Sequence, residues 1–70
     1  MSATEPLKLI RLPEVVKRTG MGRSSVYRQI ADRTFPAPAS LGGRTVAWVE
    51  AEVSQWIADR IAARDAARSV

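Results

Sequence analysis

A group of side chains able to contact nucleic acid lies between Arg23 and Ile30. Val26 and Ile30 are four residues apart, so a helix over this stretch places both on one buried face. The opposite face carries guanidinium groups, hydroxyls and a phenol, which come from Arg23, Ser24, Ser25, Tyr27 and Arg28. Guanidinium groups pair with base edges and phosphates, and hydroxyls bond to phosphate oxygens. The spacing therefore predicts a helix whose outer face can bind DNA.

These side chains suit different contacts, and two of them have an alternative role. Arg28 is central and opposite the apolar stripe, so we expect it to read a base; the alternative is an ion pair with Asp32, four residues later. Arg23 and Ser24 stand at the helix start and suit a phosphate or the first base. Tyr27 either stacks its ring at the groove and offers its hydroxyl to a phosphate, or is a partly buried core aromatic.

Several classes of chemistry are excluded by composition. The chain has no Cys and no His, which removes thiolate metal sites, disulfides, the commonest metal ligand and the usual general base. The acidic residues are scattered over the outer faces of the predicted elements, and no pair of base and nucleophile is visible. We therefore expect no enzyme, no metal, no cofactor and no small-molecule substrate.

Charge is distributed unevenly along the 70 residues. The net charge is +4, with a sequence pI near 10.7. Residues 1–48 hold eight Lys and Arg against three acids, whereas residues 49–70 hold three against four. Nine of the eleven cations are Arg, which favours bidentate recognition of a polyanion, although a soluble charged surface explains a basic excess equally well.

Glycines mark the ends of two short helices. Residues 9–12 are β-prone, and Pro13 fits the first turn of a helix that ends near Thr19. Gly20 can adopt the positive φ that closes a last helical turn. Gly22 is an acceptable N-cap for the second helix, and its missing Cβ would let a phosphate approach the helix N-terminus.

A hairpin follows the second helix. We predict strands over residues 39–41 and 44–48, joined by a Gly42-Gly43 turn, because paired glycines suit the turns that need positive φ. Arg44 then lies at the exposed tip, where packing gives no reason for an arginine. We refer to this hairpin as the wing.

The remaining apolar residues must supply the core of a single small domain. We predict a disordered leader over residues 1–8, an ordered domain over 9–63, and a fraying helix end over 64–70, where the apolar stripe has stopped. Thr34 and Lys17 could touch a DNA backbone but are more simply surface residues. The expected core includes Phe35, Val46, Trp48, Val53, Trp56, Ile57 and Ile61.

The chain resembles the AlpA family of phage and prophage regulators over roughly residues 10 to 61. The resemblance lies in five motifs: Arg11-Leu12-Pro13-Glu14-Val15, Thr19-Gly20-Met21-Gly22-Arg23-Ser24-Ser25-Val26-Tyr27, Phe35-Pro36-Ala37-Pro38, Leu41-Gly42-Gly43-Arg44-Thr45-Val46-Ala47-Trp48 and Glu52-Val53-Ser54-Gln55-Trp56-Ile57. The relatives of this family include phage excisionases and the DNA-binding heads of MerR-type regulators. The fold this implies is a mainly α winged helix-turn-helix with three helices and a small β-hairpin.

The resemblance also implies roles for individual residues. The second helix would enter the major groove, and the wing would contact the adjacent backbone or minor groove. The implied DNA-binding set is Arg23, Ser24, Ser25, Tyr27 and Arg28 on the helix with Gly42, Gly43 and Arg44 on the wing. Many relatives have Ser where this chain has Gly22, so side-chain capping of the second helix is lost here.

Three functions remain open from the sequence. The first is a sequence-specific DNA-binding transcription regulator. The second is an excisionase that bends attachment-site DNA for a phage integrase, and the third is a protein-interaction module that uses the Ala- and Arg-rich end of the last helix. Double-stranded DNA is the expected partner, with a second copy on DNA and an integrase as further candidates. The chain has no membrane-length apolar run or signal peptide, so we expect a cytoplasmic, nucleoid-associated protein with no membrane partner.

Overall fold

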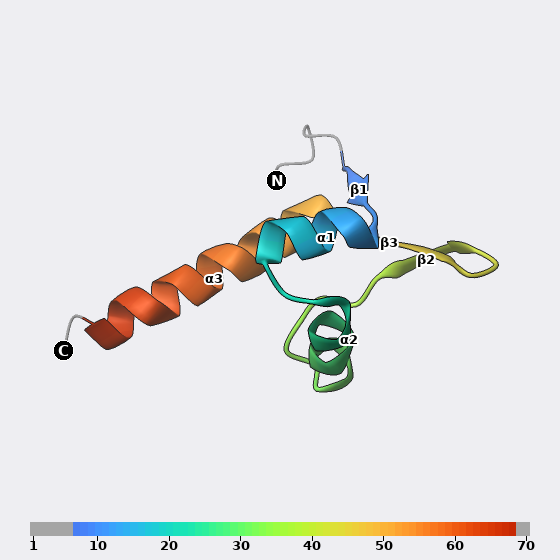
Figure 1. Ribbon diagram of the computed structural model, residues 1–70. Coiled ribbons are helices and arrows are strands. Elements are labelled where there is room, and N and C mark those ends of the chain that lie inside the picture. Colours follow the sequence, from blue (N-terminus) through green and yellow to red (C-terminus); the bar gives the residue numbers. More distant parts are fainter. Residues whose placement is uncertain (1–6, 69–70) are drawn as a thin grey trace.

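The computed structural model describes residues 7–68, and it forms three helices and a three-stranded antiparallel sheet (Figure 1). The elements follow in the order β1 (Leu9–Ile10), α1 (Leu12–Thr19), α2 (Arg23–Ala31), β2 (Ala39–Gly42), β3 (Thr45–Val49) and α3 (Glu50–Arg68). The winged helix-turn-helix architecture expected from the sequence is therefore confirmed. No helix within residues 7–68 is both long and apolar enough to cross a membrane.

The predicted leader lies mostly outside the described residues, which begin at Leu7. Lys8, which the prediction assigned to the leader, is tied to the body. Its carbonyl oxygen accepts a hydrogen bond of 2.8 Å from the backbone N–H of Glu50. The contact joins Lys8 to the first residue of α3.

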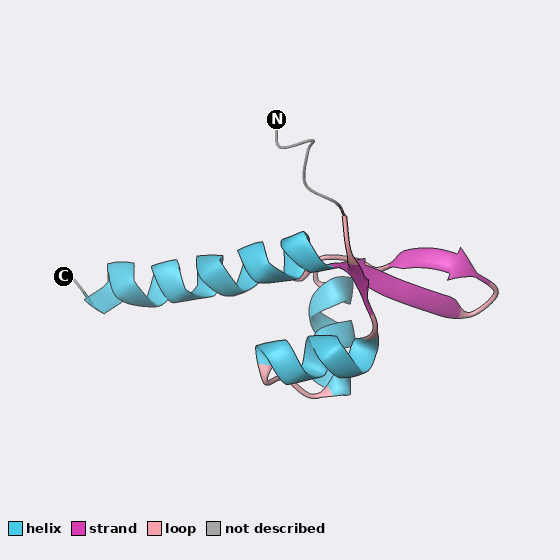
Figure 2. Ribbon diagram, turned by 90° about the horizontal axis from the view of Figure 1, so that it is seen from above, coloured by secondary structure: helices cyan, strands magenta, loops and turns pink. Residues whose placement is uncertain are grey.

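β3 is the central strand of the sheet, in the order β1-β3-β2. β1 pairs with its end, Ile10 opposite Trp48, and β2 pairs with its beginning. The wing, formed by β2 and β3, extends from the body in the direction opposite to α3 (Figures 1 and 2).

The turn of the wing lies one residue later than the sequence predicted. Gly42 belongs to β2 and pairs with Thr45, so the turn residues are Gly43 and Arg44 rather than Gly42 and Gly43. The register shifts between Ser40 and Gly42, because an extra residue is accommodated there as a β-bulge. Of the two turn residues only Gly43 has a positive φ, 57°, as in a type II′ turn.

Every element except β2 contributes a residue to one hydrophobic core. Val26 of α2 is fully buried and Ile30 packs beside it, so the stripe that oriented α2 in the sequence analysis is confirmed. Trp48 of β3 is also fully buried, and its indole N–H donates a 3.0 Å hydrogen bond to the carbonyl oxygen of Pro36. The buried cluster consists of Ile10, Val15, Val26, Phe35, Trp48 and Val53.

The segment between α2 and β2 is fixed by aromatic side chains. The ring of Phe35 meets the ring of Trp56 edge-on, with a centroid separation of 4.9 Å. The indole N–H of Trp56 donates a 2.7 Å hydrogen bond to the carbonyl oxygen of Thr34. Trp48 and Trp56 thus hold the segment that links α2 to the wing, which agrees with the prediction that both are core residues.

α3 continues well beyond the core. Val53 is buried and Trp56 and Ile57 pack against the cluster, but Ile61, which the stripe placed inward, is 47% exposed. Every residue from Ala58 to Arg68 is exposed, because no other element reaches this part of the helix (Figure 1). The helix runs to Arg68, and the fraying predicted for its end stays a prediction.

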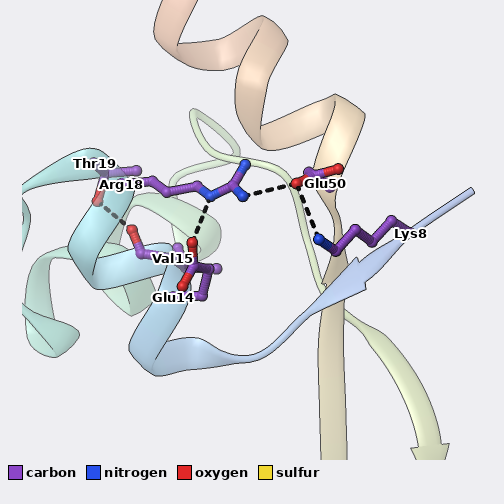
Figure 3. A network of polar contacts seen from close by, with 6 residues as sticks. All are labelled: Lys8, Glu14, Val15, Arg18, Thr19 and Glu50. Carbon is purple, nitrogen blue, oxygen red and sulfur yellow. Dashed lines mark hydrogen bonds and ion pairs between the residues drawn. The ribbon is translucent and has the colours of Figure 1, made fainter.

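An ion-pair network joins the start of α3 to α1 (Figure 3). The Arg18 guanidinium donates through Nε to Glu14 Oε2 at 2.8 Å and pairs through Nη2 with Glu50 Oε2 at 2.7 Å. Lys8 Nζ lies 3.9 Å from the same Glu50 oxygen. Glu14 and Arg18 are four residues apart on α1, so helical spacing explains their pair, but nothing local shows that Arg18 also reaches α3.

The residues with positive φ after α1 and after α2 should respond to substitution with opposite changes in stability. α1 ends at Gly20 with φ 75°, whereas α2 is followed by Arg33 with φ 64°, a left-handed conformation that a side chain disfavours. We expect Gly20→Ala to lower the free energy of unfolding by about 1–2 kcal/mol and Arg33→Gly to raise it by about 0.5–1 kcal/mol. Urea unfolding of both variants beside the parent tests this, and changes of the same sign would contradict it.

Acid should weaken the ion pair between Glu14 and Arg18 within α1. The pKa of Glu14 is held below its usual 4.5, chiefly by the hydrogen bond from Arg18. The resulting stability is complete above the unfolded pKa and is lost as the pH falls through the lower folded pKa. Melting temperatures measured from neutral pH to about pH 3 should therefore fall more for the parent than for Glu14→Gln, and parallel curves would contradict this.

Candidate nucleic-acid interface

The outer face of α2 carries two cations that have no side-chain partner of opposite charge among residues 7–68. The helix contains Arg23 and Arg28 and no acidic residue. Both arginines are exposed, and within residues 7–68 no ion pair forms between Arg28 and Asp32, the alternative considered from the sequence. Ser24 beside them is exposed and Ser25 is half-buried. Burial of Val26 therefore leaves a positively charged face open to solvent.

Tyr27 connects this face to the core. Its ring meets the ring of Trp48 edge-on with centroids 6.2 Å apart, and the residue is 39% exposed. The guanidinium carbon of Arg23 lies 6.0 Å from the Tyr27 ring centroid, a cation–π distance. Tyr27 is thus the partly buried core aromatic of the second alternative, and the part of it that stays exposed beside Arg23 leaves the DNA contact a prediction.

The N-terminus of α2 lacks a side-chain cap. Gly22 occupies the N-cap position, and no side chain of the described residues bonds to the first-turn N–H groups. A Cβ added at Gly22 would meet nothing within 4 Å, so the space before the helix is open. First-turn N–H groups and the helix dipole together favour an anion at such an end.

The wing tip is a second exposed group. Gly42 and Gly43 have φ of 112° and 57°, which only glycine adopts without strain, and neither would meet an atom within 4 Å if it carried a Cβ. Arg44 is exposed beside them, without an ion pair to any residue in the described range. The tip therefore presents one guanidinium on a backbone that is otherwise nearly bare.

The two groups are separate on the surface but share a rigid base. In the described part of the chain no ion pair or ring contact joins the α2 side chains to the tip. The ring contact between Tyr27 and Trp48 connects the two groups, because Tyr27 belongs to α2 and Trp48 belongs to β3, the strand that follows the tip. Arg44 precedes Trp48 by four residues, so the tip lies about 13 Å along the chain from this anchor.

Residues at the end of α2 serve structure rather than the open face. The Thr34 hydroxyl lies 3.2 Å from the carbonyl oxygen and 3.3 Å from the side-chain oxygen of Gln29, so Thr34 closes the helix. The Gln29 amide also lies 3.3 Å from the sulfur of Met21, across the turn. Sequence reasoning missed this bridge, because a spacing of eight residues across a turn follows no helical period. Lys17 is exposed on α1.

A protein-family model and two known proteins match this chain. The family model described as Prophage CP4-57 regulatory protein (AlpA) matches residues 8–61. A protein of Enterobacteria phage P4, described as uncharacterized protein ORF88, is 46% identical over 57 residues, which cover 81% of this chain and 65% of that protein. The chain thus spans just under two thirds of the phage protein's length.

A second relative has a functional name. The DNA-binding transcriptional activator AlpA of Escherichia coli K12 is 35% identical over 66 residues, which cover 86% of this chain and 94% of the relative. The search of solved structures gave no match. The family model covers most of the chain, including both helices of the helix-turn-helix and the wing. This chain therefore belongs to the AlpA family of prophage regulatory proteins.

Proposed function

We propose that this protein is a sequence-specific DNA-binding transcription regulator that places α2 in the major groove and the wing on the flanking backbone or minor groove. The observation that carries the proposal is the open cationic face of α2, whose arginines have no acidic partner within residues 7–68. The name of the E. coli relative, a DNA-binding transcriptional activator, supports the same function.

The dimensions of α2 suit the groove. Its nine residues span about 13 Å along the axis, and the major groove is about 12 Å wide. Arg28, in the middle of the exposed face, is placed to pair with a guanine edge. Arg23, Ser24 and Ser25 stand at the uncapped N-terminus, where a phosphate would meet the first-turn N–H groups. The ring of Tyr27, next to the Arg23 guanidinium on the same helix, would help to hold Arg23 in position.

The wing extends the contact beyond the major groove. With α2 held against Trp48 by Tyr27, Arg44 lies about 13 Å further along β3. That distance is sufficient to reach across one sugar–phosphate strand. Gly42 and Gly43 leave room for the backbone of the tip to approach a phosphate closely. A site read by one such small domain is short, so two copies on DNA would increase specificity.

Specific observations distinguish the proposed regulator from an excisionase and from a protein-interaction module. An excisionase would use the same surface, and the relative with a functional name is a transcriptional activator, which favours regulation. A protein-interaction module acting through the end of α3 would associate without strong salt dependence. A protein that binds DNA through phosphate contacts loses affinity with salt, with a slope of about −0.9 per neutralised phosphate. As a regulator, the protein would act in the nucleoid of the host cytoplasm.

Replacing Arg28 should relax sequence specificity. A bidentate arginine–guanine contact contributes about 1–3 kcal/mol of discrimination between bases. We expect Arg28→Ala to lose preference at one position of a site selected from random DNA, with a smaller effect on binding to unrelated sequences. Arg68→Ala removes the same charge from the far end of α3 and is the matched control. Equal specificity of the two variants and the parent would contradict the base-reading role.

Replacing Arg44 should weaken binding to all sequences alike. If the wing holds the DNA backbone, Arg44→Ala lowers specific and non-specific affinity by the same factor and reduces the salt slope by about one. Fluorescence anisotropy on a selected site and a scrambled site, over a series of salt concentrations, measures both quantities. An unchanged slope would remove Arg44 from the interface, and a salt-independent parent would overturn DNA binding itself.

A further inference from the structure

Leu41 is a large apolar side chain that the fold does not use. It is 50% exposed, and it belongs neither to the buried cluster nor to the partly buried residues that pack against that cluster. It lies in β2, all four of whose residues are exposed. An isolated exposed leucine is ordinary on a protein surface, so the local backbone decides whether this one is special.

The β-bulge makes Leu41 the extra, unpaired residue of β2. Ser40 pairs with Val46 and Gly42 pairs with Thr45, which leaves Leu41 without a partner on β3. The backbone N–H of Gly42 donates a 3.3 Å hydrogen bond to the Ser40 hydroxyl, and Gly42 adopts a φ of 112° that a side chain would strain. Bulges re-aim a side chain at the edge of a sheet. The backbone at this position is therefore specialised, although Leu41 adds nothing to the core.

The surroundings of Leu41 point to a narrow, negatively charged partner. The next two residues are glycines, so Leu41 and Arg44 are the nearest large side chains on either side of a slender tip. The minor groove of B-DNA is about 6 Å wide, so a group that enters it must be slender. Arginine is attracted by the potential of a narrow minor groove, and apolar side chains are used there as wedges between base steps.

We propose that Leu41 is a wedge that the wing inserts into the DNA minor groove, where it partly unstacks one base step and bends the duplex. Arg44 anchors the tip at the groove while Leu41 covers the apolar edge of the opened step. The inference rests on the proposed function, because it requires the wing to be at the DNA. It goes further by assigning a residue that neither packing nor charge accounts for, and by specifying what that residue does to the DNA.

The test compares Leu41→Ser with Leu9→Ser in the full-length protein. Leu9 is 45% exposed on β1, so its replacement removes a similar apolar surface away from the wing. A selected site carries dyes at both ends for energy transfer, and 2-aminopurine is substituted at successive positions to report unstacking. We expect the parent and Leu9→Ser to bend the DNA and raise 2-aminopurine fluorescence at one step. Leu41→Ser should lose both signals and roughly three- to tenfold in affinity.

Two further measurements complete the design. Leu41→Met keeps a flexible apolar side chain and should retain the bend, and unchanged melting temperatures of the Leu41 variants would show that the fold is intact. If Leu41→Ser bends DNA and unstacks the step as the parent does, the wedge is overturned while DNA binding by the parent keeps the proposed function standing. If the parent binds no DNA, both are overturned.

Discussion

The burial of Trp48 is the interaction on which the rest of this small structure depends. A fully buried tryptophan removes about 150–250 Å² from water, worth at most about 4–6 kcal/mol, which is a large share of the stability available to a domain of 70 residues. Trp48 stands in the central strand, its N–H is satisfied by Pro36, and its ring contacts Tyr27. One side chain thereby joins the base of the wing, the connecting segment and α2.

The position of Trp48 explains how so short a chain can hold the outer face of α2 and the wing tip in a fixed position relative to each other. Within residues 7–68 no ion pair or ring contact joins the outer face of α2 to the wing tip. Their geometry comes instead from the inner side, where Val26 and Trp48 share one core. Within residues 7–68 the arginines of the α2 face and the wing tip have no ion-pair partner, whereas Arg18 ties α1 to α3.

Residues with a positive φ lie close to the outer face of α2 and to the wing tip. Gly20 closes α1 with a positive φ as expected, Arg33 adopts one at the end of α2 in spite of its side chain, and Gly42 and Gly43 adopt them at the wing. Gly22 leaves α2 without a side-chain cap. A chain selected only for stability would favour glycine at position 33 and a capping side chain at position 22. Gly22 and Arg33 therefore depart from local preferences at the two ends of α2, the helix that we assign to DNA.

The sequence by itself determined what depends on neighbouring residues. Short-range spacing and glycine geometry predicted three features that the structure shows. These are the end of α1 at Gly20 and the start of α2 after Gly22, the orientation of α2 through Val26 and Ile30, and the exposed position of Arg28. The AlpA resemblance was likewise visible in motifs, and the family model matches residues 8–61, which contain all of them.

Only the tertiary structure decided what depends on residues far apart in the chain. The bulge moved the turn to Gly43 and Arg44, because strand register is set by pairing across the hairpin and not by the turn residues alone. Ile61 stayed exposed although it continues a helical stripe, because burial requires a facing element and none reaches that far along α3. Tyr27 became both anchor and surface residue for the same reason, since its place is fixed by Trp48, twenty-one residues later. Periodicity states which face of an element is apolar, but packing between elements determines how much of that face is covered.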